Sequence, residues 1–229
     1  MKKNTILKKV VVKFAGDSGD GMQFTGSQFT ETAALLGNDL ATFPDFPAEI
    51  RAPRGSVAGV SGFQVHIGEV EINTPGDHAD VLVAMNAAAL KSNLNNVKNS
   101  ATIIVDTDNF SAKDVRKAGF DSNPLENNVL NGHHVVEAPI SRLTRDALKD
   151  SGLDGKSIMR CKNMFALGIV YWMFNRPLDY SEKRIQQKFK NKEPLIKANI
   201  LALQSGYNYA ETIEVLTSTF EVPPAKIER

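Results

Sequence analysis

The sequence has 229 residues, of which 42% are hydrophobic, enough for one large domain or two small ones with a buried core. Its 27 Lys and Arg nearly balance 26 Asp and Glu, and a net charge of +1 gives no reason to expect a nucleic acid or a membrane surface as partner. With one cysteine, Cys161, the chain can form neither a disulfide framework nor a cysteine-ligated iron–sulfur cluster.

The first elements are a strand, a helix and an irregular stretch. Val10–Ala15 is a β-rich run that predicts the first strand. After Gly21, apolar residues recur at steps of three and four, which predicts a helix that Gly37 and Asn38 end. Three prolines exclude a helix from residues 40–54.

Strand and helix patterns then alternate along the middle of the chain. Loose alternation over 57–67 predicts a strand broken at Gly59 and Gly62. Continuous apolar runs predict further buried strands, and helical segments lie between most of them. These strands are expected at 80–85, 102–105 and 134–138, and the helices at 86–96, 112–117 and 141–149.

The last third is predicted to be helical. Residues 164–174 are apolar around the whole circumference, so this helix is either central or docked against a partner. A helix over 181–190 follows, then one that Pro194 opens and Gly206 closes, and a last one capped by Asn208 and Glu211. The whole pattern predicts an α/β fold: a Rossmann-like, mostly parallel sheet flanked by helices, with a helical C-terminal layer.

Neither a secretory leader nor a membrane span is expected. The basic start is followed by an apolar run too short and too charged for a signal peptide. The longest apolar run, 164–174, is far shorter than the roughly 20 residues that a span needs. We therefore expect a cytoplasmic protein.

The sharpest local signal is a glycine-rich turn between the first strand and the first helix. It reads Gly16-Asp17-Ser18-Gly19-Asp20-Gly21-Met22. Glycines allow close approach of a ligand to the backbone, and a helix N-terminus offers free N–H groups to an anion. The alternative is a structural turn in which Asp20 caps the helix.

The turn matches none of the standard binding motifs. Ser18 occupies the middle glycine position of a dinucleotide fingerprint, and Met22 stands where a Walker A motif has its lysine. Gly16 falls on the first ligand position of a calcium loop. The ligand, if one binds, is therefore recognised in another way.

Longer stretches resemble a known family. They are Gly16–Gly26, Phe43–Gly55, Gly62–Gly68, Cys161–Gly168 and Lys197–Tyr207. In order and spacing they resemble the gamma domain of 2-oxoacid:ferredoxin oxidoreductases, most closely the N-terminal part of the 2-oxoglutarate:ferredoxin oxidoreductase alpha subunit. The resemblance covers about residues 10–210.

The resemblance implies a function within a complex. Such enzymes decarboxylate a 2-oxoacid on thiamine diphosphate, pass two electrons through iron–sulfur clusters to ferredoxin and transfer the acyl group to coenzyme A. The gamma domain contributes to the coenzyme A site, whereas thiamine diphosphate, Mg and the clusters belong to partner domains or subunits. We expect this chain to be part of such an enzyme, here making succinyl-CoA, and not to be catalytically complete alone.

The resemblance also implies domain bounds. We expect a gamma-type domain at 1–220 and a stiff exit linker at 221–229, leading toward the pyrimidine-binding domain for thiamine diphosphate. Family members of the fused kind continue for several hundred residues. A truncated form is therefore expected rather than a complete subunit.

Candidate coenzyme A contacts come from three stretches. Backbone N–H groups of the turn suit the pantetheine arm or the pyrophosphate, and Arg51 and Arg54 suit charge-assisted bonds to phosphate unless Glu49 or an Asp pairs with them. Asn163, in the first turn of the apolar helix, needs a polar partner in the turn, in the ligand or in the fold. The full set is Gly16, Asp17, Ser18, Gly19, Asp20, Gly21, Met22, Arg51, Arg54, Gly55, Ser56 and Asn163.

Other reactive side chains favour structural interpretations. Cys161 is expected to be a buried thiol rather than a nucleophile. Asp106 and Asp108 follow a strand at its carboxyl end, where open α/β sheets bind ligands, but Asp-rich turns are common helix caps, and the cap is the favoured interpretation. Two alternatives to a coenzyme A domain are a scaffold that touches no ligand and an independent nucleotide-binding protein.

Overall fold

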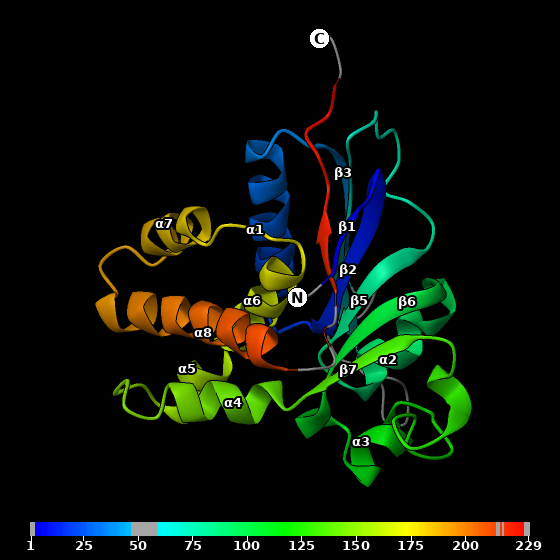
Figure 1. The fold of residues 1–229 in the computed structure, drawn as a ribbon. Coiled ribbons are helices and arrows are strands. Elements are labelled where there is room, and N and C mark those ends of the chain that lie inside the picture. Colours follow the sequence, from blue (N-terminus) through cyan, green and yellow to red (C-terminus); the bar gives the residue numbers. More distant parts are fainter. Residues whose placement is uncertain (1–2, 47–58, 214–215, 217, 227–229) are drawn as a thin grey trace.

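A computed structural model describes residues 3–46, 59–213, 216 and 218–226 (Figure 1). Its centre is a six-stranded sheet in the order β3-β4-β2-β5-β6-β7. Strand β4 runs antiparallel to both of its neighbours, and the other neighbouring pairs are parallel. The strands are β2 (Lys9–Asp17), β3 (Asp39–Asp45), β4 (Val60–Gly68), β5 (Ala79–Ala84), β6 (Val97–Asp106) and β7 (His134–Ala138).

Helices cover both faces of this sheet, and the alternation of side chains along β2 produces two cores. Val10, Val12 and Phe14 face one core, and Val11 and Ala15 face the other. The first core lies under α1 (Met22–Leu35), α4 (Ile140–Ala147), α5 (Gly155–Met159), α6 (Lys162–Met173), α7 (Asp179–Lys188) and α8 (Glu193–Thr212). The second lies under α2 (Ala87–Asn93) and α3 (Ala112–Lys117), and short 3₁₀ turns lie at Leu94–Asn96, Thr107–Asn109 and Asn128–Leu130. The predicted α/β fold with its helical C-terminal layer is confirmed.

Helix α6 is the central helix of the larger core. Every residue from Asn163 to Met173 is buried, mainly against α8 and α1 within the same chain. The apolar circumference seen in the sequence therefore reflects a central position, and no partner is needed to cover it.

Two predictions about α8 are wrong. The helix runs through Gly206 to Thr212, so Gly206 does not end it, and Asn208 and Glu211 lie inside it rather than capping a further helix. Gly206 instead faces α6, where an added Cβ would lie 1.9 Å from the Phe165 carbonyl oxygen. Gly206 allows α6 and α8 to pack closely. The neighbouring residues in the sequence do not distinguish a glycine with this role from one that caps a helix.

Predictions for the first half hold better. Gly37, at φ +80°, ends α1 as predicted. The non-helical stretch from Leu40 contains the strand β3 up to Asp45, which was not predicted. Gly62 does not interrupt β4, because it keeps its place in the ladder opposite Ala15.

A second, two-stranded sheet joins the chain ends. Strands β1 (Lys3–Ile6) and β8 (Ser218–Glu221) pair in parallel. The Asn38 Nδ2 donates to the carbonyl oxygens of Val222 (3.0 Å) and Pro223 (2.8 Å). The first residues of the predicted linker are therefore held on the domain surface, while the boundary at 220 stays a prediction.

Candidate functional site

The carboxyl ends of β2, β5 and β6 form the candidate site. From β2 the chain turns into α1 on one face of the sheet, and from β5 it turns into α2 on the other. Strands β2 and β5 are parallel neighbours, so the crevice between their ends is a topological switch point. Ligands of open α/β sheets bind at such points.

The glycine-rich turn occupies this edge. Gly21 precedes α1 with φ +75°, and in the described part of the chain no side chain caps the helix start. The backbone angle favours glycine here, and a Cβ on Gly21 would displace the Asn163 amide, whose Nδ2 would lie 2.5 Å away. Around Gly19, by contrast, an added Cβ would meet no atom within 4 Å, and the turn is open on that side.

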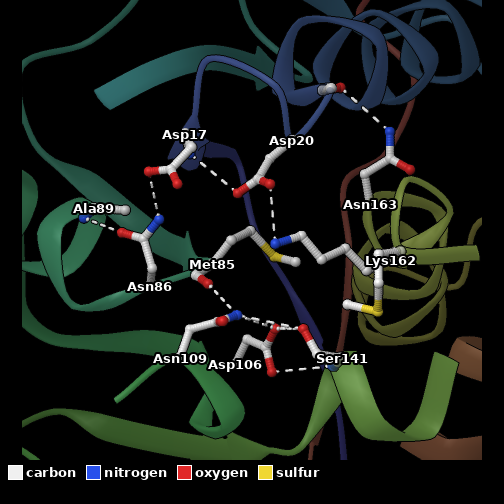
Figure 2. Close-up of polar contacts among 12 residues, drawn as sticks. Asp17, Asp20, Met85, Asn86, Ala89, Asp106, Asn109, Ser141, Lys162 and Asn163 are labelled. Atoms are coloured by element: carbon white, nitrogen blue, oxygen red, sulfur yellow. Dashed lines mark hydrogen bonds and ion pairs between the residues drawn. The ribbon is translucent and has the colours of Figure 1, made fainter. Parts of the chain in front are cut away.

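Asp20 closes the turn instead of capping the helix, so the cap alternative is wrong (Figure 2). Its Oδ2 accepts the backbone N–H of Asp17 at 3.0 Å, and its Oδ1 pairs with the Lys162 Nζ at 2.9 Å. Both side chains of the pair are only 12% exposed. Sequence reasoning missed Lys162, although it directly precedes the candidate Asn163.

Asp17 connects the turn to the next strand. Its Oδ1 accepts a hydrogen bond of 2.8 Å from the Asn86 Nδ2, while the Asn86 Oδ1 caps α2 at the N–H of Ala89. Burial, followed by the charge of Asp20, raises the pKa of the Asp17 carboxyl above its usual value. The carboxylates of this edge therefore repel one another, and an added anion meets an unfavourable potential.

Asp106 and Asp108 have structural roles, but Asp106 does not cap the 3₁₀ turn that follows β6; both side chains instead bind the first turn of α4. Asp106 is fully buried and accepts the N–H and hydroxyl of Ser141 at 3.1 and 2.6 Å, and Asn109 at 2.7 Å. Asp108 accepts the N–H of Arg142 at 2.6 Å. Burial raises the pKa of the Asp106 carboxyl, and the nearby Lys162 acts in the opposite direction.

Asn163 contacts the glycine-rich turn, which was one of the polar partners predicted for it. Its Nδ2 donates to the Gly21 carbonyl at 3.4 Å and its Oδ1 accepts the N–H of Met164 at 2.8 Å. Met22 is buried in the core and only 1% exposed, so its side chain is not available to a ligand. Arg51, Arg54, Gly55 and Ser56 lie outside the described residues.

Cys161 is buried, and burial raises the pKa of its thiol to about 11. The thiolate fraction at pH 8 is then about a hundredfold below that of a free thiol. We expect iodoacetamide to label Cys161 at pH 8 at least tenfold more slowly in the folded chain than in urea, as followed by mass spectrometry. Equal rates would show an accessible thiolate.

The described residues contain neither a cluster of metal ligands nor a helix suited to span a membrane. Among residues 3–46, 59–213 and 216–226 as far as described, no group of three or more His, Cys, Asp or Glu side chains is placed to hold a metal ion. No described helix combines the length and apolar character that crossing a bilayer requires. The chemistry of the edge is thus that of carboxylates, amides and one lysine.

Comparison with known proteins gives a consistent family. A family model described as pyruvate ferredoxin/flavodoxin oxidoreductase matches residues 11–209. The chain is 49% identical over 221 residues to the 2-oxoglutarate oxidoreductase subunit KorA of Mycobacterium tuberculosis, covering 96% of this chain and 34% of that protein. It thus spans about a third of this relative.

Solved structures share the fold. The 2-oxoglutarate:ferredoxin oxidoreductase of Magnetococcus marinus, determined with 2-oxoglutarate, coenzyme A and succinyl-CoA, matches with a TM-score of 0.74 at 25% identity, over 96% of this chain and 34% of that one. A keto/oxoacid ferredoxin oxidoreductase gamma subunit from Geobacter sulfurreducens matches with a TM-score of 0.61 at 19% identity, over 89% of this chain and 99% of its own. The latter match shows the fold alone.

Proposed function

Since this chain belongs to the pyruvate ferredoxin/flavodoxin oxidoreductase family, we propose that it is the coenzyme-A-side domain of a 2-oxoglutarate:ferredoxin oxidoreductase. The complete enzyme decarboxylates 2-oxoglutarate, transfers the succinyl group to coenzyme A and passes two electrons to ferredoxin. The observation that carries the proposal is the 49% identity to a 2-oxoglutarate oxidoreductase subunit along nearly the whole chain.

In this proposal, the carboxyl edge of the sheet binds the uncharged part of coenzyme A. Asp17, Asp20 and Asp106 lie near the ammonium of Lys162, with which Asp20 forms an ion pair (Figure 2). Repulsion from these carboxylates disfavours a phosphate at the turn. The pantetheine arm, which has amide groups and no charge, suits the open side of Gly19, where an added Cβ would meet no atom within 4 Å.

The phosphates of coenzyme A then require cations from another segment. Arg51 and Arg54, on the Pro- and Gly-rich stretch after β3, are the proposed contacts, with Gly55 and Ser56 beside them. Binding energy from these remote groups positions the thiol for acyl transfer. The domain thereby holds the acceptor of the acyl group.

The redox and decarboxylation cofactors belong to partner domains or subunits in this proposal. Iron–sulfur clusters need several cysteine thiolates, and this sequence has one cysteine, which is buried. Thiamine diphosphate supplies the carbanion chemistry of decarboxylation, so its partner domains, the cluster-bearing subunits and ferredoxin are the expected partners.

The proposal is tested by a tagged pull-down from native cytoplasm, followed by an assay of viologen reduction. We expect activity that depends on both 2-oxoglutarate and coenzyme A and that co-purifies with thiamine diphosphate and iron. A chain that emerges alone and inactive from cells containing such an enzyme would contradict the assignment. Activity with another 2-oxoacid in place of 2-oxoglutarate would keep the family and change the substrate.

A charge-removing variant tests the phosphate contacts. In the assembled enzyme, Arg54→Ala is expected to raise the KM for coenzyme A roughly 10- to 150-fold, because a charge-assisted hydrogen bond contributes roughly 1.5–3 kcal/mol. The KM for 2-oxoglutarate should stay unchanged, which serves as the internal control. An unaltered KM for coenzyme A would remove Arg54 from the site, and the same result for every turn and loop variant would favour a scaffold role.

A further inference from the structure

A cavity lies between α1 and α7, and its lining contains none of the residues Gly16–Met22 of the glycine-rich turn. Figure 1 shows the two helices beside each other on the same side of the sheet. The cavity has a volume of about 350 Å³, and its lining includes Phe24, Gln28, Glu31, Arg184 and Lys188. This volume falls at the lower end of the range for small-molecule sites, about 300–1,000 Å³.

The lining contains an unpaired buried amide. Gln28 is 1% exposed, and neither its Oε1 nor its Nε2 has a hydrogen-bond partner among the described residues. Its backbone oxygen, in contrast, accepts the hydroxyls of Thr32 and Tyr171 at 2.9 and 3.0 Å. An unpaired carboxamide at such a position destabilises the fold, so its presence calls for a ligand or another compensating role.

The lining also includes Lys188, an exposed residue whose ammonium pairs with no carboxylate among the described residues. The Lys188 Nζ lies 3.5 Å from the centre of the Phe24 ring. Burial, and then the charge of Arg184, lowers its pKa. Arg184 itself is neutralised by Glu31, which forms an ion pair with its Nε at 2.7 Å and accepts a hydrogen bond from its Nη2 at 3.0 Å.

We propose that this cavity binds a small organic monocarboxylate, which uses Lys188 for its carboxylate, Phe24 for its apolar part and the Gln28 carboxamide for a hydrogen bond. The lining contains two cations, Arg184 and Lys188, and one acid, Glu31, so a ligand with a single negative charge neutralises it. A phosphate dianion would exceed that balance. The site shares no residue with the proposed coenzyme A contacts, so the two proposals stand or fall separately.

Binding is tested on the full chain with benzoate as the probe and benzamide as its uncharged analogue. Ligand-observed NMR titration should give a Kd for benzoate that rises at least tenfold in Lys188→Met, whereas benzamide should bind more weakly and equally to both proteins. Lys183→Met, an exposed lysine on the same helix outside the cavity, is the matched control and should leave the Kd unchanged. Benzoate that fails to bind the folded wild type at millimolar concentration, or binds equally to Lys188→Met, would overturn the proposal.

A second variant tests the amide. Gln28→Met keeps the shape of the side chain and removes the unpaired donor and acceptor, so we expect a melting temperature at or above that of the wild type without ligand. The same variant should bind benzoate several-fold more weakly. A clear loss of melting temperature would show that the carboxamide is satisfied within the fold, which contradicts a ligand role for Gln28.

Discussion

Replacing Gly206 by alanine is expected to lower the free energy of unfolding by about 3 kcal/mol, equivalent to a fall of about 10 °C in melting temperature. The added methyl group would lie 1.9 Å from the Phe165 carbonyl oxygen and 2.7 Å from its carbonyl carbon. These are backbone atoms of α6, so relief requires the two helices to separate. Urea and thermal unfolding of the full chain measure the effect.

The sign of this result is informative because glycine-to-alanine changes inside helices usually stabilise, by about 1 kcal/mol. Gly155→Ala, at the start of α5, is the matched control, since its Cβ would meet no atom within 4 Å. We expect that variant to be neutral or slightly more stable. A neutral Gly206→Ala would mean that α6 and α8 lie farther apart than the structure has them.

Replacing Lys162 by methionine is expected to cost about 2 kcal/mol at pH 7, less than the loss of one partner from a fully buried pair. Asp20 would lose its counter-ion at 2.9 Å while remaining close to Asp17. Lys162 also lowers the pKa of Asp17 and Asp106, which burial raises. Without the lysine both pKa values should rise further.

The pH dependence of the Lys162→Met variant follows from these directions. A carboxyl whose folded pKa lies above its unfolded value favours folding below the unfolded pKa and loses that contribution as the pH rises through the folded pKa. The stability deficit relative to wild type should therefore be larger at pH 7 than at pH 5 in urea unfolding. Adding Asp20→Asn should recover part of the loss, and an equal deficit at both pH values would point to lost packing of the lysine methylenes.

The fold class could be predicted because its main signals are local. Val10–Ala15 and the apolar runs near residues 82 and 104 have the composition of buried strands, and the period after Gly21 is that of a helix. Gly37 was likewise predicted to end the first helix, and its positive φ is typical of a glycine at that position. Each of these patterns depends only on residues a few positions apart, so it can be recognised in the sequence.

The site was predictable only in part. The turn and Asn163 were identified, and the structure brings them together through the 3.4 Å contact between the Asn163 Nδ2 and the Gly21 carbonyl. The pairing of Asp20 with Lys162 joins positions 142 residues apart and was not foreseen. Which charges compensate each other is a property of distance in space, and spacing along the chain does not encode it.

The sequence by itself determined the alternation of strands and helices, the glycine-rich turn and the absence of cluster cysteines. Only the tertiary structure decided that Gly206 is a packing glycine, that α6 is central, and that the turn lies in a net-acidic edge. The physical reason is the same in each case. Glycine is favoured both at a helix cap and where two helices cross closely, and an apolar helix has the same sequence whether its own chain or a partner buries it. Only the surrounding elements distinguish these cases.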